Sequence, residues 1–349
     1  MKMNPSQLWL AIGFSCLALG LSAAQVGARS KQPPVIEAPP PPPMPPVALA
    51  DHFVEEAAAY QDYMREAALI SPAFSGQAGV EQSLKTGAAY EAGQFLRGEI
   101  AYAAIAALQD RAFVAAVRAA GPTPQDRYAI VAKIYADPAN AMSFAGAKDA
   151  AGMAKFALAG DGMRLFNSGK AVKLAAYSIQ HQSWSLAPVA DQAGRLDQVK
   201  ALSRSPRAVS PLQTEVLARM ASGEPDPKVA ADPAPPPYSP LIVRAVALAA
   251  LAAIGQAGDD DAVHLAWLTD DYFTVHCVAQ AKLALNECLS VARPYYEDVF
   301  CLGQHAMNDT GSCVVRGAGS VVPLEIATQS FAVPPVGGRA QSHARRHRT

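Results

Sequence analysis

The sequence predicts an all-α protein, a multi-helix array whose C-terminal end is a disulfide-stapled helical hairpin. Hydrophobic residues make up 51% of the 349-residue chain but aromatic residues only 7%, which favours closely packed, alanine-rich helices over a β-sandwich. Helix-start signals recur along the chain, and apolar residues follow them at helical spacing. The alternation of apolar and polar residues that is typical of strands is nearly absent before residue 314.

The first 28 residues have the parts of a secretory signal peptide. Lys2 gives a positive start, an apolar run follows from Leu8 to Ala24, and small residues stand at cleavage spacing around its end. The run is shorter than the ~20 residues of a membrane-spanning helix, and an uncleaved membrane anchor is the alternative. We therefore expect residues 1–28 to direct export. The alanine- and arginine-rich composition favours a bacterial periplasm as the destination.

Proline-rich stretches divide the rest of the chain. Residues 29–46 predict an extended linker in the polyproline II conformation, and residues 223–240 predict an interdomain linker or a long exposed loop. Between them lies a predicted helical domain at 47–222, and after them a helical module at 241–316. Residues 317–349 are expected to form an extended arm and a basic, disordered tail.

Four pairs of a capping residue and a proline mark helix starts, because the cap side chain accepts from free amides and proline suits the first turn. These pairs are Thr123-Pro124, Asp137-Pro138, Ser210-Pro211 and Ser239-Pro240. Apolar periodicity predicts helices at 47–70, at 81–119 as one long or two shorter helices, at 147–182 and at 188–203.

The segment 241–290 resembles a HEAT-type helical repeat. Val243-Arg244 lies in a first apolar helix, a glycine turn follows at Gly255, and the pattern restarts at Val275-His276, about 32 residues later. His276 replaces the arginine that is usual at this place, and the second unit lacks a glycine turn. The resemblance implies paired helices. Such pairs most often form binding surfaces, which is an analogy from fold.

Four cysteines lie close together near the C-terminus, at Cys277, Cys288, Cys301 and Cys313. In an exported protein such an even set predicts two disulfides. Cys277 and Cys288 share a predicted helix over 274–290, in which their Cα atoms would lie ~16.5 Å apart. They cannot bond to each other, because a disulfide needs Cα atoms within ~7 Å.

Pro294 opens the next predicted helix, which carries Cys301, and Cys313 follows a break expected at Gly311. If the two helices fold back as a hairpin, the disulfides nest as Cys288–Cys301 and Cys277–Cys313. A staggered return would instead cross them as Cys277–Cys301 and Cys288–Cys313. A zinc site is disfavoured, because zinc-binding cysteines come in short C-x₂₋₄-C pairs that these spacings lack.

The sequence holds no catalytic, metal or cofactor motif, and its net charge of −1 gives no support to nucleic-acid binding. Glycine-containing stretches at 160–162 and 167–170 lack the spacing of a phosphate loop. Residues 177–184 are the richest in groups that could hold a ligand. The candidate binding residues there are Tyr177, Gln180, His181 and Trp184. Their spacing also fits packing with a polar rim.

Histidines and aspartates near Cys277 could be drawn as a metal site. We favour a structural interpretation, in which Asp270 and Asp271 cap helices and the histidines His264 and His276 lie on helix surfaces. No metal ligand and no cofactor is therefore predicted.

Taken together, these features favour an exported, periplasmic, non-enzymatic helical protein that acts as a protein-binding or cell-envelope-associated scaffold. Its expected partner is another envelope protein or the cell-envelope surface, with membrane contact only through the N-terminal segment if that stays uncleaved. One alternative is a hydrolase of envelope polymers whose site is assembled from distant residues. The other is a small-ligand-binding module around Trp184.

Overall fold

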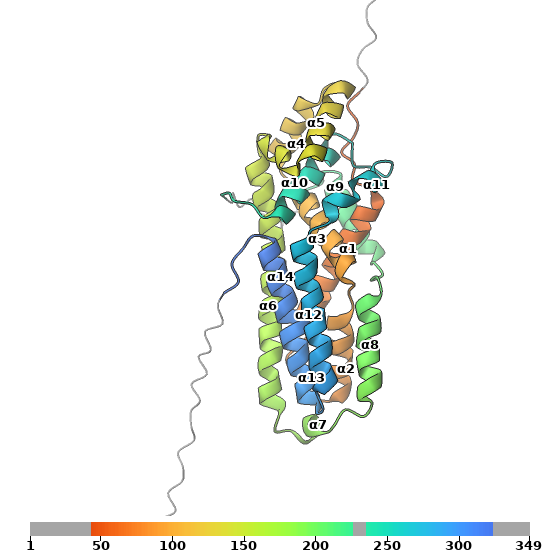
Figure 1. Cartoon of the computed structure of the whole chain (residues 1–349), viewed down its shortest axis with the longest axis vertical. Helices are drawn as coiled ribbons and strands as arrows, with labels where there is room; N and C mark the ends of the chain where they lie inside the picture. Colours follow the sequence, from red (N-terminus) through yellow and green to blue (C-terminus); the bar gives the residue numbers. More distant parts are fainter. Residues whose placement is uncertain (1–42, 226–234, 324–349) are drawn as a thin grey trace, which may run out of the picture. The chain divides into compact units, whose positions relative to one another are not determined.

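The computed structural model describes residues 43–225 and 235–323, which belong to one compact unit (Figure 1). The predicted signal peptide, most of the first proline-rich linker, the middle of the second stretch and the basic tail lie outside the described residues. The all-α prediction is confirmed, because the described residues form helices and contain no strand.

Fourteen α-helices and three short helical segments follow one another along the described residues. In chain order they are α1 (Asp51–Ala68), α2 (Gln77–Ala88), α3 (Ala92–Ala107), α4 (Arg111–Ala120), α5 (Pro124–Ala136), η1 (Pro138–Ser143), α6 (Ala147–Ile179), α7 (Ser183–Leu186), α8 (Gln192–Arg204), α9 (Pro211–Ala221), α10 (Pro240–Ala253), α11 (Ala262–Leu265), η2 (Ala266–Thr269), α12 (Tyr272–Val291), α13 (Tyr295–Cys301), η3 (Leu302–Asp309) and α14 (Thr310–Gly317).

The predicted helix starts differ in how they are capped. Thr123 forms a capping box with Asp126, in which Thr123 Oγ1 accepts from the Asp126 amide and the Asp126 carboxylate accepts from the Thr123 amide, both at 3.2 Å. Ser239 Oγ accepts from an amide in the first turn of α10. Asp137 precedes the 3₁₀ segment η1 instead of an α-helix, and Ser210 precedes α9 without a side-chain cap bond.

The segment 81–119 contains parts of three helices, where one or two were expected. Glu91 caps α3 by accepting from two amides of its first turn, at 2.8 and 2.7 Å. Asp110 caps α4 by accepting from the amide of Phe113 at 2.6 Å. Each carboxylate starts a new helix because its oxygens bond amides that have no partner within that helix's first turn.

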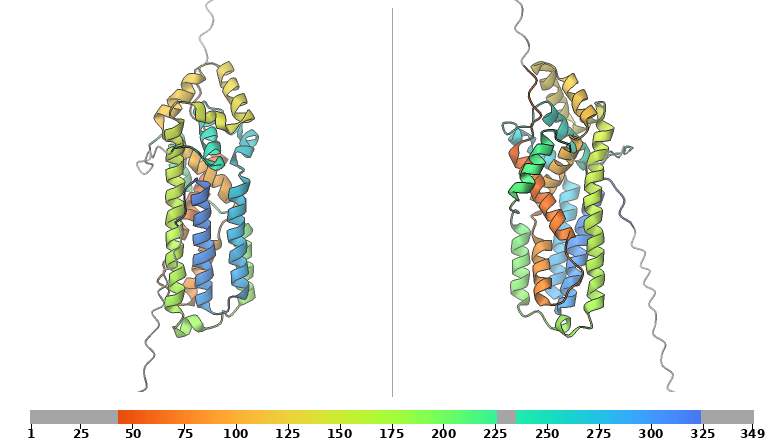
Figure 2. Two further views of the ribbon diagram at one scale, coloured as in Figure 1. Left: turned by 60° about the vertical axis from the view of Figure 1, so that its left-hand side comes forward. Right: turned by 180° about the vertical axis from the view of Figure 1, so that it is seen from behind.

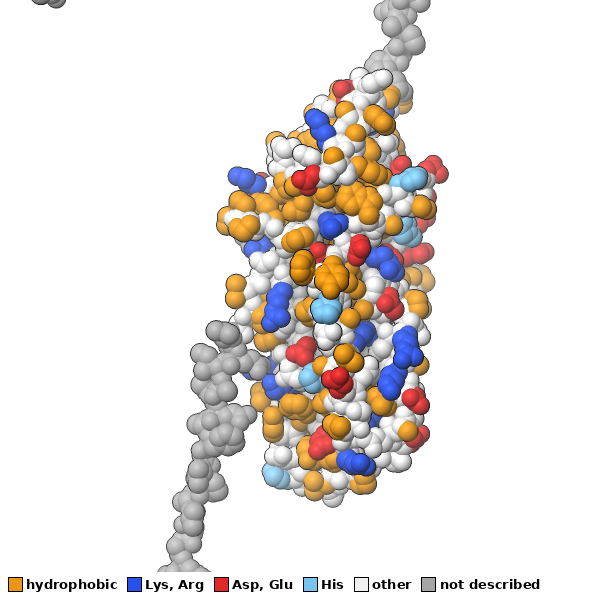
Figure 3. All heavy atoms as spheres, viewed as in Figure 1, with side chains coloured by type: hydrophobic (Ala, Val, Ile, Leu, Met, Phe, Trp, Pro, Cys, Tyr) orange, Lys and Arg blue, Asp and Glu red, His pale blue; other side chains and the backbone are white. Residues whose placement is uncertain are grey.

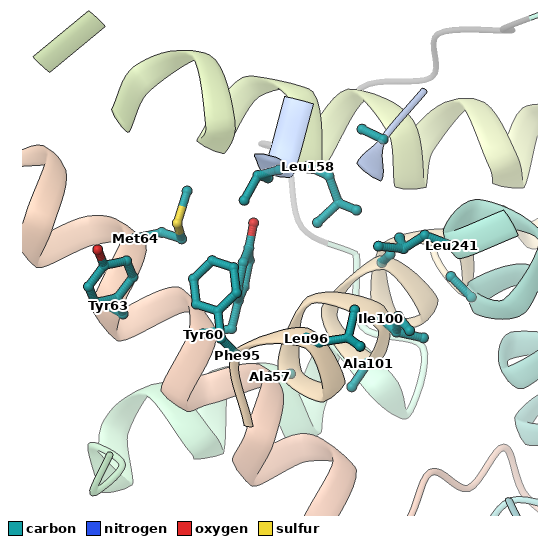
Figure 4. Close-up of a cluster of buried hydrophobic side chains, with 14 of the residues drawn as sticks. Ala57, Tyr60, Tyr63, Met64, Phe95, Leu96, Ile100, Ala101, Leu158 and Leu241 are labelled. Carbon is teal, nitrogen blue, oxygen red and sulfur yellow. The ribbon is translucent and has the colours of Figure 1, made fainter. Parts of the chain in front are cut away.

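The core lies where α1, α3, α6 and α10 meet (Figure 4). Tyr60 and Tyr63 on α1 are each 1% exposed, and both rings meet Phe95 of α3 edge-on, at centroid distances of 5.1 and 5.6 Å. Such aromatic pairs add about 0.5–1.5 kcal/mol beyond the area they bury. The aliphatic side chains drawn around them include Met64, Leu96, Ile100, Leu158 and Leu241.

Helices from both sides of the second proline-rich stretch share this core. α10 follows the stretch, yet it packs against α3 and α6, which precede it, and residues 245–253 of α10 are all buried. The stretch 223–240 therefore connects two elements of one compact unit. Whether α10 and the helices after it form a HEAT-type repeat stays a prediction.

The last helical segments run on without a break. α13, the π-helical segment η3 and α14 form one continuous helix over residues 295–317, which we call the C-terminal rod. The rod packs against α6 on one side and α12 on the other (Figure 2). Pro294 is the N-cap residue of α13, in agreement with the expected start after that proline.

The break expected at Gly311 is wrong, because Gly311 lies inside α14 and serves close packing. A methyl group added there would lie 2.6 Å from the amide nitrogen of Phe166 and 2.7 Å from the carbonyl oxygen of Gly162, both on α6. A methyl group at Gly169 would likewise lie 2.8 Å from the carbonyl oxygen of Gly303. The three glycines of the stretches 160–162 and 167–170 thus lie within α6. Two of them, Gly162 and Gly169, allow the backbone of α6 to contact the backbone of the rod.

Within the described ranges, no single helix is long and apolar enough to cross a membrane, and only α3 with α4 passes on length and composition as a pair, bent by 89°.

Candidate functional site

Both disulfides join α12 to the C-terminal rod in the predicted nested order. Cys277 bonds to Cys313 and Cys288 bonds to Cys301, each with a Cα–Cα distance of 5.7 Å. The two cysteines of α12 lie on nearly the same face of that helix and cannot reach each other. The nested hairpin is confirmed, and the crossed alternative does not occur.

An apolar pocket opens beside the Cys288–Cys301 disulfide, between α6, α12 and α13. Its volume is about 370 Å³, within the range of small-molecule sites. Its lining residues are Ala176, Tyr177, Gln180, Cys288, Val291, Ala292, Tyr296, Glu297, Phe300 and Cys301. We call it the disulfide pocket.

Aromatic rings and one carboxylate shape the rim of the disulfide pocket. The rings of Tyr177 and Phe300 meet edge-on with centroids 6.2 Å apart, and Tyr177 is 44% exposed. The Tyr296 hydroxyl donates to Glu297 Oε1 at 3.4 Å, and Glu297 Oε2 accepts from the Arg293 amide at 2.8 Å. The pocket therefore presents apolar ring and aliphatic surface with a polar edge.

Two of the four candidate binding residues line the disulfide pocket and two do not. Tyr177 and Gln180, one turn apart near the end of α6, both line the disulfide pocket. His181 is exposed beyond the end of that helix, and Trp184 is half-buried in the short helix α7, where its Nε1 donates to Gln182 Oε1 at 2.5 Å. The chain turns at Gln182, so His181 and Trp184 are not among the residues that line the pocket.

Asp271 and Cys277 each have a structural role. Asp271 caps α12 by accepting from the Thr274 amide at 3.0 Å, and Cys277 is bonded to Cys313. In the part of the chain that the structure describes, no three His, Cys, Asp or Glu side chains gather in a way that could hold a metal ion.

Lys282 is a buried cation that sequence reasoning missed. It lies on α12 and is 7% exposed. Its Nζ donates to the Ala88 carbonyl at 3.2 Å and sits 3.5 Å from the centre of the Tyr90 ring. Burial lowers the pKa of Lys282 to about 7, although the Glu91 carboxylate acts in the opposite direction. The signal was a lysine on the apolar stripe of α12, between Val278 and Leu285.

Comparisons of the chain with protein-family models, with curated proteins and with solved structures gave no match. A proposal about function is therefore argued from the fold and from the geometry of the site.

Proposed function

We propose that the protein is an exported, non-enzymatic helical binding protein whose small ligand enters the disulfide pocket. The observation that carries this proposal is that Tyr177 and Gln180, two of the residues indicated by the sequence, line that pocket together with Tyr296 and Phe300. Export is supported by the two disulfides, since such bonds persist in oxidising compartments. The signal-like segment at 1–28 supports it as well.

The lining indicates what kind of molecule fits. Val291, Phe300 and the Tyr177 ring offer apolar surface, whereas the carboxamide of Gln180 and the carboxylate of Glu297 offer hydrogen bonds at the edge. The matching ligand is a small molecule with an apolar ring and one hydrogen-bond donor. Binding would bury the ligand's ring against the aromatic side chains, and this burial of apolar surface would stabilise the complex.

The neutral probe N-phenyl-1-naphthylamine, an amine that carries a naphthyl group and a phenyl group, tests this site by its fluorescence gain in apolar surroundings. We expect saturable binding to the oxidised full chain, and Tyr177→Ala or Phe300→Ala should weaken it about 10-fold or more, because each removes a ring that the probe buries. Tyr128→Ala removes a 75% exposed tyrosine of α5 and is the matched control. Equal binding by the wild type and both pocket variants would refute the site.

The compartment is tested separately from the ligand. Cells of the native host would be fractionated after thiol alkylation, and the protein mapped without reduction. We expect the extracytoplasmic fraction to contain the Cys277–Cys313 and Cys288–Cys301 peptides. A protein found only in the cytoplasm with alkylated cysteines would contradict export.

One surface favours a second candidate function, binding of another envelope protein. Val263 of α11 and Tyr272 and Phe273 of α12 are 84%, 70% and 77% exposed, and the Tyr272 ring stacks on His276 at 5.8 Å. Apolar side chains are exposed around this end of α12 in Figure 3. Exposed aromatic side chains in a group are typical of protein-binding surfaces.

A pull-down from envelope extracts tests this surface. Wild-type protein should retain a partner that a Tyr272→Ser/Phe273→Ser variant loses, whereas Leu212→Ser, at a 71% exposed leucine of α9, should retain it. A partner captured equally by all three proteins would place its binding surface elsewhere.

A further inference from the structure

A second pocket, on the opposite side of α12 from the disulfides, surrounds the buried Lys282. It lies between α8, α12 and the start of α3, and its volume is about 580 Å³. Its lining residues are Glu91, Ala92, Lys200, Ser203, Arg204, Ala279, Lys282, Leu283 and Asn286. We call it the lysine pocket. It shares no lining residue with the disulfide pocket.

Two polar atoms in the lysine pocket are buried without a hydrogen-bond partner among the described residues. They are Ser203 Oγ on α8 and Asn286 Oδ1 on α12, one turn from Lys282. A buried polar atom without a partner destabilises the folded protein. Buried polar atoms are bonded in the large majority of proteins, so a ligand or ordered water is the expected partner of both atoms.

Positive charge dominates the lysine pocket. Lys282 is joined there by Lys200 and Arg204 of α8, and neither of these forms a salt bridge with a described carboxylate. Glu91 is the one carboxylate in the lining, and both of its oxygens accept amides of α3. The Lys282 ammonium has three N–H donors, of which the Ala88 carbonyl accepts one.

Lys282 also has a structural partner, because Ala88 is the last residue of α2 and a cation at a helix C-terminus is stabilised by the exposed carbonyls. That role accounts for one N–H and for the cation–π contact with Tyr90. It explains neither the two unpaired atoms nor the cations of α8. The arrangement therefore contains more hydrogen-bonding and charged groups than a helix cap needs.

We propose that the lysine pocket binds a small polyhydroxy carboxylate. The carboxylate would accept from the Lys282 ammonium and the Ser203 hydroxyl, with Lys200 and Arg204 completing its charge neutralisation. A ligand hydroxyl would donate to Asn286 Oδ1, which needs a donor that a simple anion lacks. Ala92, Ala279 and Leu283 would cover the carbon skeleton.

Binding at this site is coupled to the proton on Lys282. The charged groups that face Lys282 are Glu91, which precedes α3, and Lys200 and Arg204 on α8. The Tyr90 ring contacts the ammonium through its face. The pKa of Lys282 is about 7 in the free protein, so its ammonium form is mostly present at pH 6 and rare at pH 8.5. A ligand that requires the charged form should bind about 30-fold more weakly at pH 8.5 than at pH 6, because its affinity falls in proportion to the fraction of Lys282 that carries the proton.

Calorimetric titration of the oxidised full chain with gluconate tests the site. We expect binding at pH 6 that weakens about 30-fold at pH 8.5, with proton uptake on binding at the higher pH. Glucose, which lacks the carboxylate, should not bind, and acetate and sulfate, which lack a hydroxyl that could donate to Asn286 Oδ1, should bind at least about 10-fold more weakly. No gluconate binding at pH 6, or equal binding of sulfate, would overturn the proposal.

Variants separate binding from a purely structural role of Lys282. Lys282→Met should abolish gluconate binding and proton uptake, and Lys170→Met, at an exposed lysine of α6, is the matched control. If Lys282→Met fails to fold, Ser203→Ala and Asn286→Leu provide the test, since each should weaken binding about 10-fold while leaving the chain folded. Wild-type affinity in all these variants would overturn the proposal. None of them alters the disulfide pocket, so the two sites are tested independently.

Discussion

Glu99 is a carboxylic acid in the middle of an apolar core. It has no exposed surface, and neither of its carboxylate oxygens has a hydrogen-bond partner among the described residues. Burial raises the pKa of Glu99 well above its usual range, and the nearby Asp271 raises it further. Folding therefore favours the protonated form of the Glu99 carboxyl, whereas the unfolded chain exposes it to water, where it ionises more readily.

This difference predicts how stability depends on pH. A group whose pKa is raised by folding stabilises the folded state at low pH, and that contribution is lost as the pH rises towards the folded pKa. Glu99→Gln stays neutral throughout, so its stability relative to the wild type should increase above pH 5 by up to about 1.4 kcal/mol per pH unit. Guanidinium unfolding at pH 4.5, 6 and 7.5 measures the free energy of unfolding of both proteins. Glu55→Gln, an exposed glutamate of α1, should follow the wild type. Parallel curves for Glu99→Gln and wild type would contradict a neutral Glu99.

The sequence could predict which side chains lie together only where these residues are close along the chain. Tyr177 and Gln180 lie one turn apart on a predicted helix, and both line the same pocket. Lys282 was missed because the Ala88 carbonyl lies 194 residues away and the other lining groups come from α3 and α8. No local pattern indicates that the lysine on the apolar stripe of α12 lies near the cations Lys200 and Arg204 of α8.

At the scale of helices, glycines control the distance between α6 and the C-terminal rod. A methyl group at Gly162 would lie 2.8 Å from a Val315 side-chain carbon and 2.9 Å from the Gly311 carbonyl oxygen, whereas one at Gly160 would meet nothing within 4 Å. Gly162→Ala should therefore lower the free energy of unfolding by about 1–3 kcal/mol through overpacking.

The matched control lies on the same helix. Gly160→Ala should leave stability unchanged or raise it by up to ~1 kcal/mol, because alanine is the better helix former. Urea unfolding of both variants measures the difference. If the two changes had the same effect, close backbone contact at Gly162 would not be what holds α6 against the rod.

The two disulfides should differ in strength because they close loops of different length. The sequence separations are 36 residues for Cys277–Cys313 and 13 for Cys288–Cys301. Loss of chain entropy in the unfolded state then gives about 4 and about 3 kcal/mol respectively. Replacing Cys277 and Cys313 by alanine should lower the unfolding free energy by about 1 kcal/mol more than replacing the inner pair. A larger loss from the inner pair would contradict this ranking.

Helix geometry made the disulfide pairing predictable, and the same kind of reasoning failed at Gly311. Spacing along α12 excluded a Cys277–Cys288 bond, because helical rise is independent of the rest of the fold. A glycine, in contrast, marks either a break or a close approach of two backbones. Only the position of α6, packed along the rod at Gly162 and Phe166, decides between the two.

On the scale of the whole molecule, the two sides of the 223–240 stretch depend on each other. α10 packs against α3 and α6, α12 against α8, and the rod against α6, whereas both disulfides lie after the stretch. Apart from the polypeptide chain itself, noncovalent packing thus joins the described residues of the two parts. From the sequence, the stretch could be an interdomain linker or a long exposed loop, because proline-rich stretches often separate cores, and no local pattern shows that the helices on either side bury the same surface.

A protease site inserted within 226–234 tests this dependence. After cleavage the two parts should elute together in size-exclusion chromatography in native buffer and separate in urea. The fragment from residue 235 onward, expressed alone and oxidised, should lack a cooperative unfolding transition by circular dichroism, since its helices would expose their buried faces. Separation of the cleaved parts in native buffer would show two independent cores.

The outer disulfide has a mechanical consequence. A pulling force applied to the chain ends would pass from Cys277 to Cys313 through the sulfur atoms, so the segment between them, a sequence separation of 36, would carry no load. At about 3.5 Å per extended residue, roughly 120 Å of chain would stay hidden until the bond is reduced. Most of α12 and of the rod, including Lys282 and its pocket residue Asn286, lies within this shielded length.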